Sequence, residues 1–117
     1  MLSHIDELLN APTTGASAPS LERLEDTLTD GYAQALALEG ECWRLERQLA
    51  KVARTVGGPE PDISSAAEEI STLAKRIACA EEELTSLRDR LGSLQDRTRS
   101  MRRAQRADLL QATLGPS

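Results

Sequence analysis

A seven-residue hydrophobic repeat runs through two long stretches of this chain, on either side of the glycine- and proline-containing segment 57–62. In both stretches apolar or small residues recur at alternating spacings of three and four. The repeat positions are Leu21, Leu24, Leu28, Gly31, Ala35, Leu38, Cys42, Leu45, Leu49, Val52 and Val56, and then Ile63, Ala66, Ile70, Leu73, Ile77, Ala80, Leu84, Leu87, Leu91, Leu94, Thr98 and Met101. A repeat of about 3.5 residues kept over this many turns requires each helix to wind around a partner helix. The sequence therefore predicts two long helices that pack along one seam.

The segment between the two stretches predicts an antiparallel hairpin. Its two glycines favour the end of a helix, and its two prolines prevent the helix from continuing. A connection of six residues is typical of antiparallel neighbours. We predict an all-α fold, a long antiparallel two-helix coiled-coil hairpin, with helices at 21–56 and 63–111, a turn at 57–62 and a tail at 112–117.

Side-chain size and charge also favour the antiparallel alignment. It places small seam residues opposite large ones and brings Gly31 near Leu87, to within one core layer. It also lays the acidic start of the first helix, which includes Glu25, beside arginines late in the second helix. Exposed ion pairs stabilise little individually, but they select the orientation of paired helices.

The N-terminal region 1–20 combines a short apolar helix face with a linker. The apolar face consists of Leu2, Ile5, Leu8 and Leu9. A helix of this length is not stable alone. The following residues 11–20 are rich in Pro, Thr, Ser, Gly and Ala, as in a flexible or extended linker. The segment is expected either to dock on a partner or to fold back onto the hairpin as a flap.

A second apolar stripe lies beside the seam of the first helix. Its members are Tyr32, Leu36, Trp43 and Ala50, at spacings of four, seven and seven. A two-helix hairpin leaves this stripe in water, and Trp and Tyr are over-represented among residues that dominate binding energy. We predict a partner interface here, at which a further helix pair completes a four-helix bundle, although scattered exposed apolar residues are common on proteins. The partner is either this same chain, as a dimer or tetramer, or another coiled-coil subunit.

The end of the second helix concentrates positive charge. Residues 102–111 are expected to extend beyond the end of the first helix. The basic patch consists of Arg97, Arg99, Arg102, Arg103 and Arg106. Such a patch can contact phosphates, but arginines also complement a helix C-terminus and pair with acidic residues on a neighbouring helix. No aromatic residues are interleaved to stack on bases, so nucleic acid is the weaker interpretation.

Composition and charge argue against several classes of protein. The 117 residues include no Phe, one Trp and one Tyr, which is typical of long helices and not of a globular enzyme. A net charge of -5 gives no general attraction to nucleic acid or membranes. The first residues do not resemble a signal peptide, and no long uncharged apolar stretch occurs. We expect a soluble, intracellular, cytoplasmic protein whose two cysteines, Cys42 and Cys79, are reduced.

No group of residues predicts catalysis. The single histidine, His4, belongs to no constellation of cysteines or carboxylates at ligand spacing, so we expect no enzyme activity, no cofactor and no metal site. The predicted function is a non-enzymatic coiled-coil structural or adaptor subunit that assembles through helix packing. The alternative is a regulatory helical hairpin that binds nucleic acid or another polyanion through its C-terminal arginines.

Overall fold

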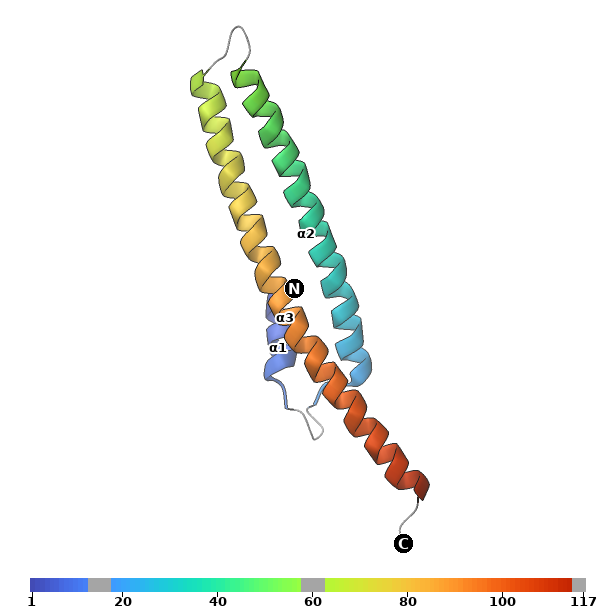
Figure 1. Cartoon of the computed structure of the whole chain (residues 1–117). Coiled ribbons are helices and arrows are strands. Elements are labelled where there is room, and N and C mark those ends of the chain that lie inside the picture. Colours follow the sequence, from blue (N-terminus) through green and yellow to red (C-terminus); the bar gives the residue numbers. More distant parts are fainter. Residues whose placement is uncertain (13–17, 58–62, 115–117) are drawn as a thin grey trace. The chain divides into compact units, whose positions relative to one another are not determined.

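The structure is a computed structural model that describes residues 1–12, 18–57 and 63–114 (Figure 1). Helix α1 spans Leu2–Asn10, α2 spans Leu21–Val56 and α3 spans Ile63–Leu114. The described residues contain no strand, and α2 and α3 pack against each other. The predicted all-α helical hairpin is confirmed. The turn residues 58–62 and the last residues 115–117 lie outside the described residues.

Helix α2 begins at a serine cap and α3 is longer than predicted. The backbone N–H of Arg23 donates to Oγ of Ser20 at 3.1 Å, which satisfies one of the free N–H groups of the first turn. Helix α3 continues to Leu114, past the predicted end at residue 111. The leucine, alanine and glutamine residues that fill its last turns are strong helix formers, which explains the extension.

The predicted seam is the buried face of both long helices. Every predicted position of α2 is buried or partly buried, and so is every predicted position of α3 except Ile63. Ile63 is exposed because it is the first residue of α3, so no preceding helical turn covers it. The heptad pattern therefore identifies the packed face correctly along nearly its whole length.

Contacts within the chain divide it into two compact units. The terminal unit comprises residues 1–33 and 87–117, and the central unit comprises residues 34–86. Each unit contains part of α2 and part of α3, and the terminal unit also contains α1.

The core of the central unit is an aliphatic cluster between α2 and α3. Leu45 and Val52 of α2 pack with Leu73 of α3. The partly buried residues around them are Leu49, Ala66, Ile70 and Ile77. At the surface, Glu41 of α2 and Arg76 of α3 form an ion pair of 3.9 Å. This apolar cluster holds the two helices together, since so exposed an ion pair contributes little.

The two cysteines differ in environment. Cys42 is buried in the seam of the central unit and Cys79 is exposed, and both are free thiols. Burial raises the pKa of the Cys42 thiol, and the carboxylates of Glu81, Glu46 and Glu41 raise it further. Cys42 is therefore protonated at neutral pH and behaves as a small apolar side chain.

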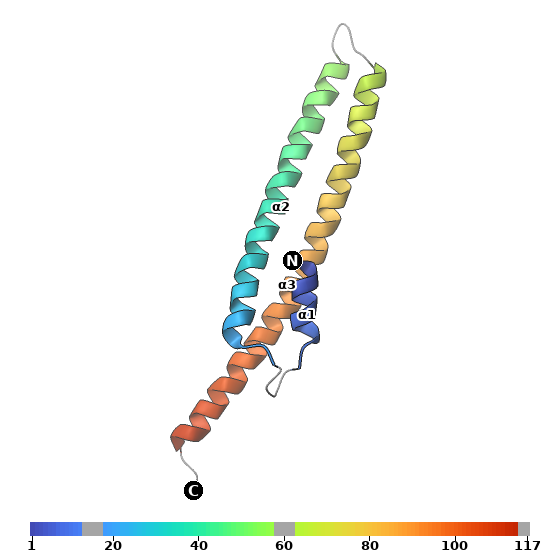
Figure 2. The same ribbon diagram turned by 180° about the vertical axis from the view of Figure 1, so that it is seen from behind.

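In the terminal unit, α1 lies beside α3, as both views show (Figures 1 and 2). Ile5 and Leu8 of α1 are buried, as are Leu24 of α2 and Leu91 and Leu94 of α3. The structure therefore adopts the second of the two expected alternatives, in which the N-terminal segment folds back as a flap. The flap converts a two-helix seam into a three-helix core.

Gly31 leaves a notch in α2 that Leu91 of α3 fills. A Cβ atom added at Gly31 would overlap with Cδ2 of Leu91. The register in the terminal unit is therefore one core layer away from the predicted one, which placed Gly31 near Leu87. Leu87 and Leu91 are chemically identical and one helical turn apart, so side-chain size did not distinguish the two registers.

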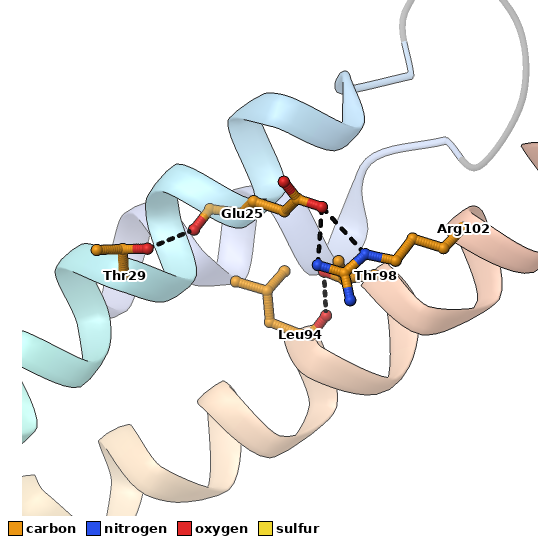
Figure 3. Close-up of polar contacts among 5 residues, drawn as sticks. All are labelled: Glu25, Thr29, Leu94, Thr98 and Arg102. Atoms are coloured by element: carbon orange, nitrogen blue, oxygen red, sulfur yellow. Dashed lines mark hydrogen bonds and ion pairs between the residues drawn. The ribbon is translucent and has the colours of Figure 1, made fainter.

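Two buried threonines are accommodated by hydrogen bonds within their own helices. Thr98 Oγ1 donates to the carbonyl of Leu94 at 2.8 Å (Figure 3). Thr27 Oγ1 donates to the carbonyl of Arg23 at 2.9 Å. Because both hydroxyls have acceptors, the terminal core buries them without the cost of an unpaired polar group.

Candidate functional site

The central unit exposes an apolar face on α2. Leu36 is 70% exposed and Trp43 is 59% exposed, and Ala50 is exposed as well. These residues follow one another at intervals of one heptad, so they lie along one side of α2. The residues that pack against α3, such as Leu45, lie on a different side and are buried. The central unit thus leaves two large apolar side chains of α2 in contact with water.

Gly40 and Arg47 occupy the places between these apolar residues. The resulting set, which we call the outer stripe, consists of Leu36, Gly40, Trp43, Arg47 and Ala50. Its spacings of four, three, four and three match those of the seam. Among the described side chains, a Cβ atom at Gly40 would approach only the Arg44 guanidinium, at 3.7 Å. The outer stripe therefore has the spacing of a second seam, with an open notch at its glycine.

Charges of opposite sign flank the outer stripe. One edge carries Glu39 and Glu46, and the other edge carries Arg44 and Lys51. The acidic residues occupy the g positions of the stripe's heptad and the basic residues occupy the e positions. A shallow groove near the C-terminal end of the stripe is lined by Trp43, Glu46, Arg47 and Ala50. The stripe thus combines an apolar centre with two edges of opposite charge.

Tyr32, the remaining predicted interface residue, belongs to the terminal unit. It is 48% exposed, and its hydroxyl donates to Oε1 of Gln95 on α3 at 3.1 Å. The polar end of this side chain is therefore engaged within the chain. Sequence reasoning missed Gln95, because this residue lies beside the seam and not in it, and heptad spacing does not mark such positions.

The predicted docking segment faces the interior of the terminal unit. Its four residues are Ile5 and Leu8, which are buried, and Leu2 and Leu9, which are partly buried. On the polar side of α1, Oδ1 of Asp6 accepts a hydrogen bond from Nε of Arg90 at 2.7 Å. The apolar face of α1 is thus already covered within the chain.

The predicted basic patch is divided among different contacts. Arg97 donates to the backbone carbonyls of Leu9 and Ala11 at the end of α1. Nη2 of Arg102 lies 2.8 Å from Oε1 of Glu25 on α2 (Figure 3). Both arginines are therefore engaged in contacts within the terminal unit.

The other arginines of the patch are more exposed. Nη1 of Arg99 lies 4.0 Å from Oδ1 of Asp96 on the same helix. Arg103 and Arg106 are exposed and make no hydrogen bond or ion pair with any residue that the structure describes. All side chains from 102 to 112 are exposed, so this part of α3 is uncovered, although Arg102 still reaches α2.

The contacts of Arg97 explain how α1 ends without a glycine. Ala11 after α1 has an extended backbone, with φ -70° and ψ 155°, so the last carbonyls of the helix need donors from elsewhere. The Arg97 guanidinium supplies them from α3. Sequence reasoning missed this role, because nothing in the local pattern of α3 indicates a contact with a segment more than 80 residues earlier.

Replacing Arg97 by glutamine should loosen α1 from the terminal unit. Charge-assisted hydrogen bonds contribute about 1.5–3 kcal/mol, so the free energy of unfolding should fall by about 1–3 kcal/mol. Amide hydrogen exchange in α1 should accelerate by more than tenfold. Arg103→Gln is the matched control and should change neither quantity, because Arg103 is exposed and makes no hydrogen bond or ion pair with the described part of the chain. Unaltered hydrogen exchange in α1 of the Arg97 variant would show that the hydrogen bonds from Arg97 to the Leu9 and Ala11 carbonyls do not stabilise α1.

The described ranges 1–12, 18–57 and 63–114 give no support for a metal centre or a membrane-spanning helix. Within these ranges no three His, Cys, Asp or Glu residues gather to hold a metal ion. None of the helices described there combines the length and the apolar character needed to cross a membrane. No protein-family model matches the chain, and comparisons with curated proteins and with solved structures find no significant match. The chain's own geometry is therefore the basis for a functional proposal.

Proposed function

We propose that this protein is a non-enzymatic coiled-coil structural or adaptor subunit of the cytoplasm. It assembles with further helices through the outer stripe of α2. The exposure of Leu36 and Trp43 on one face of a helix that is already packed on another face carries this proposal. A second hairpin laid on the outer stripe would bring four helices into one assembly.

Water contacts two large apolar side chains on this face of α2. Complete burial of a leucine side chain stabilises by about 1.5–3 kcal/mol, and a tryptophan buries a still larger surface. Tryptophan is also among the residues that most often dominate binding energy. Two such residues at heptad spacing on one helix face favour a helical partner, because a second helix contacts both at once.

The double variant Leu36→Ala with Trp43→Ala should weaken assembly without unfolding the chain. Loss of two central apolar contacts should reduce association about 30- to 1,000-fold, since each such contact commonly contributes about 1–2 kcal/mol. The free energy of unfolding of the isolated chain should change by less than about 0.5 kcal/mol, because neither side chain is buried in it. Light scattering across a concentration series measures the first quantity, and urea unfolding measures the second.

The matched control is Leu110→Ala, which removes an exposed leucine from α3 of the terminal unit. It should leave assembly unchanged. Assembly with helical proteins from the cells of origin should follow the same pattern, with partners retained by the control and lost by the double variant. If the double variant assembles as well as the unaltered chain, the proposed role of the outer stripe is wrong.

The polyanion alternative has less support. Arg97 and Arg102 are engaged within the terminal unit, so Arg103 and Arg106 are the patch members without described contacts. If these two arginines bound DNA or RNA, the unaltered protein would show affinity at low salt, and Arg103→Gln with Arg106→Gln would abolish it while helicity stayed intact. Absence of binding by the unaltered protein at low salt eliminates this alternative.

A further inference from the structure

We propose that the occupant of the outer stripe is a second copy of this chain, with the two α2 helices parallel to each other. The proposal rests on the proposed function and names the partner of the same surface. It concerns residues 36–51, which all lie in the central unit. The distribution of charge along the two edges of the stripe carries the argument.

Helix orientation decides which edges meet. In a parallel pair, the g edge of one helix faces the e edge of the other, at an offset of five residues. Glu46 of one copy then faces Lys51 of the second copy. One heptad earlier, Glu39 of one copy faces Arg44 of the second copy. By two-fold symmetry each contact occurs twice. A parallel pair of identical chains therefore matches acidic edges with basic edges throughout the stripe.

The antiparallel arrangement gives the opposite result. There the g edges face each other and the e edges face each other, so Glu39 meets Glu46 and Arg44 meets an alanine or another cation. Like charges that face each other destabilise a pair of helices. The sign pattern of this one helix therefore selects both an identical partner and its direction.

The central layers of the outer stripe are compatible with this pairing. In a parallel pair, each residue of the stripe faces its own copy. Gly40 lacks a Cβ atom, so the two backbones can approach closely beside the paired Trp43 rings. Arg47 is the one charged member of the stripe and faces Arg47 of the second copy, and Glu46 of each copy lies at the adjacent position to offset this contact between like charges.

Reversal of one charge at a time tests the pairing. Glu46→Lys places a lysine opposite Lys51 in both symmetric contacts, and should weaken dimerisation about tenfold at low salt. Lys51→Glu should weaken it similarly. An equimolar mixture of the two variants should recover the dimer, because every contact then joins opposite charges. Glu82→Lys is the control; it makes the same charge change on an exposed residue of α3, away from the stripe, and should have no such effect.

A cysteine at the end of the stripe tests the direction independently. In a Cys79→Ser background, Ala50→Cys should form a covalent dimer under mild oxidation, because parallel helices bring both copies of position 50 together. Antiparallel helices would hold these positions about 20 Å apart at the helical rise of about 1.5 Å per residue. The buried Cys42 remains in place and should not react.

The results separate this inference from the proposed function. A chain that stays monomeric, or a Glu46→Lys variant that dimerises more tightly than the unaltered chain, overturns the parallel pairing of two copies. Neither result depends on whether a different helical protein binds the outer stripe. That broader role fails only if the Leu36→Ala, Trp43→Ala variant keeps every association of the unaltered chain.

Discussion

Replacing Leu94 by alanine should lower the free energy of unfolding by about 2–5 kcal/mol, the range typical of truncating a fully buried leucine. Leu94 is 0% exposed in the terminal unit, and its truncation leaves a cavity in addition to the loss of transfer free energy. Thr98, which donates to the Leu94 carbonyl, would remain in place, since that bond involves only the backbone of residue 94. Urea unfolding followed by the helical circular dichroism signal measures the change.

Leu36→Ala is the matched control for this experiment. It makes the same chemical change at a residue that is 70% exposed in the chain, so the expected loss is below about 0.5 kcal/mol. The comparison is made on monomeric protein, because association would add the binding energy of the outer stripe to the apparent stability. Equal losses in the two variants would contradict the assignment of Leu94 to the core.

Gly31→Leu should destabilise the terminal unit by about 1–3 kcal/mol, because Leu91 already occupies the space in front of Gly31. Leucine is a much better helix former than glycine, so helix propensity alone would predict a gain of about 0.5–1 kcal/mol. A measured loss therefore reports overlap with Leu91 and not a change in propensity. Thermal unfolding should show a lower midpoint for this variant than for the unaltered chain.

Gly92→Ala provides the comparison, since Gly92 lies one residue from Leu91 and a Cβ atom there would meet nothing within 4 Å. This exposed helical position should gain about 0.5–1 kcal/mol from alanine. If Gly31→Leu and Gly92→Ala both stabilise the protein, the fit of Leu91 into the notch at Gly31 is incorrect.

The heptad pattern was sufficient to predict the packed faces, because the period of a hydrophobic repeat is a local property of the chain. It identified residues such as Leu45 and Leu73, which the structure places in one cluster. It did not determine the register in the terminal unit, where Leu87 and Leu91 offered equivalent partners for Gly31. Register depends on how one side chain fills a specific notch, and this becomes visible only when both helices are in place.

The position of α1 could not be predicted from the sequence, for a different reason. Its apolar face indicated burial, but the same face suits a partner protein and the hairpin equally well. The choice is decided by contacts such as Asp6 with Arg90 and Arg97 with the Leu9 carbonyl, which join segments far apart in the chain. The arginines that were predicted to form one basic patch therefore make different contacts, Arg97 with the end of α1 and Arg102 with α2.

The outer stripe was only partly predicted. The sequence identified Leu36, Trp43 and Ala50 from their spacing, and their exposure in the structure is the basis of the proposal. Tyr32 was included although it belongs to the terminal unit, where its hydroxyl binds Gln95. Gly40 was overlooked. It lies four residues after Leu36 and three before Trp43, and this heptad spacing was a signal that could have found it.

Trp43 is the chain's one tryptophan, so its fluorescence reports directly on the outer stripe. The most direct test of the central claim measures its emission maximum and the solution mass on the same samples across a concentration series. The parallel pairing of two copies predicts that the mass doubles and the emission shifts to shorter wavelength with the same midpoint, as two half-exposed indoles leave water together. A constant mass, or a doubling of mass that leaves the emission unchanged, would contradict it.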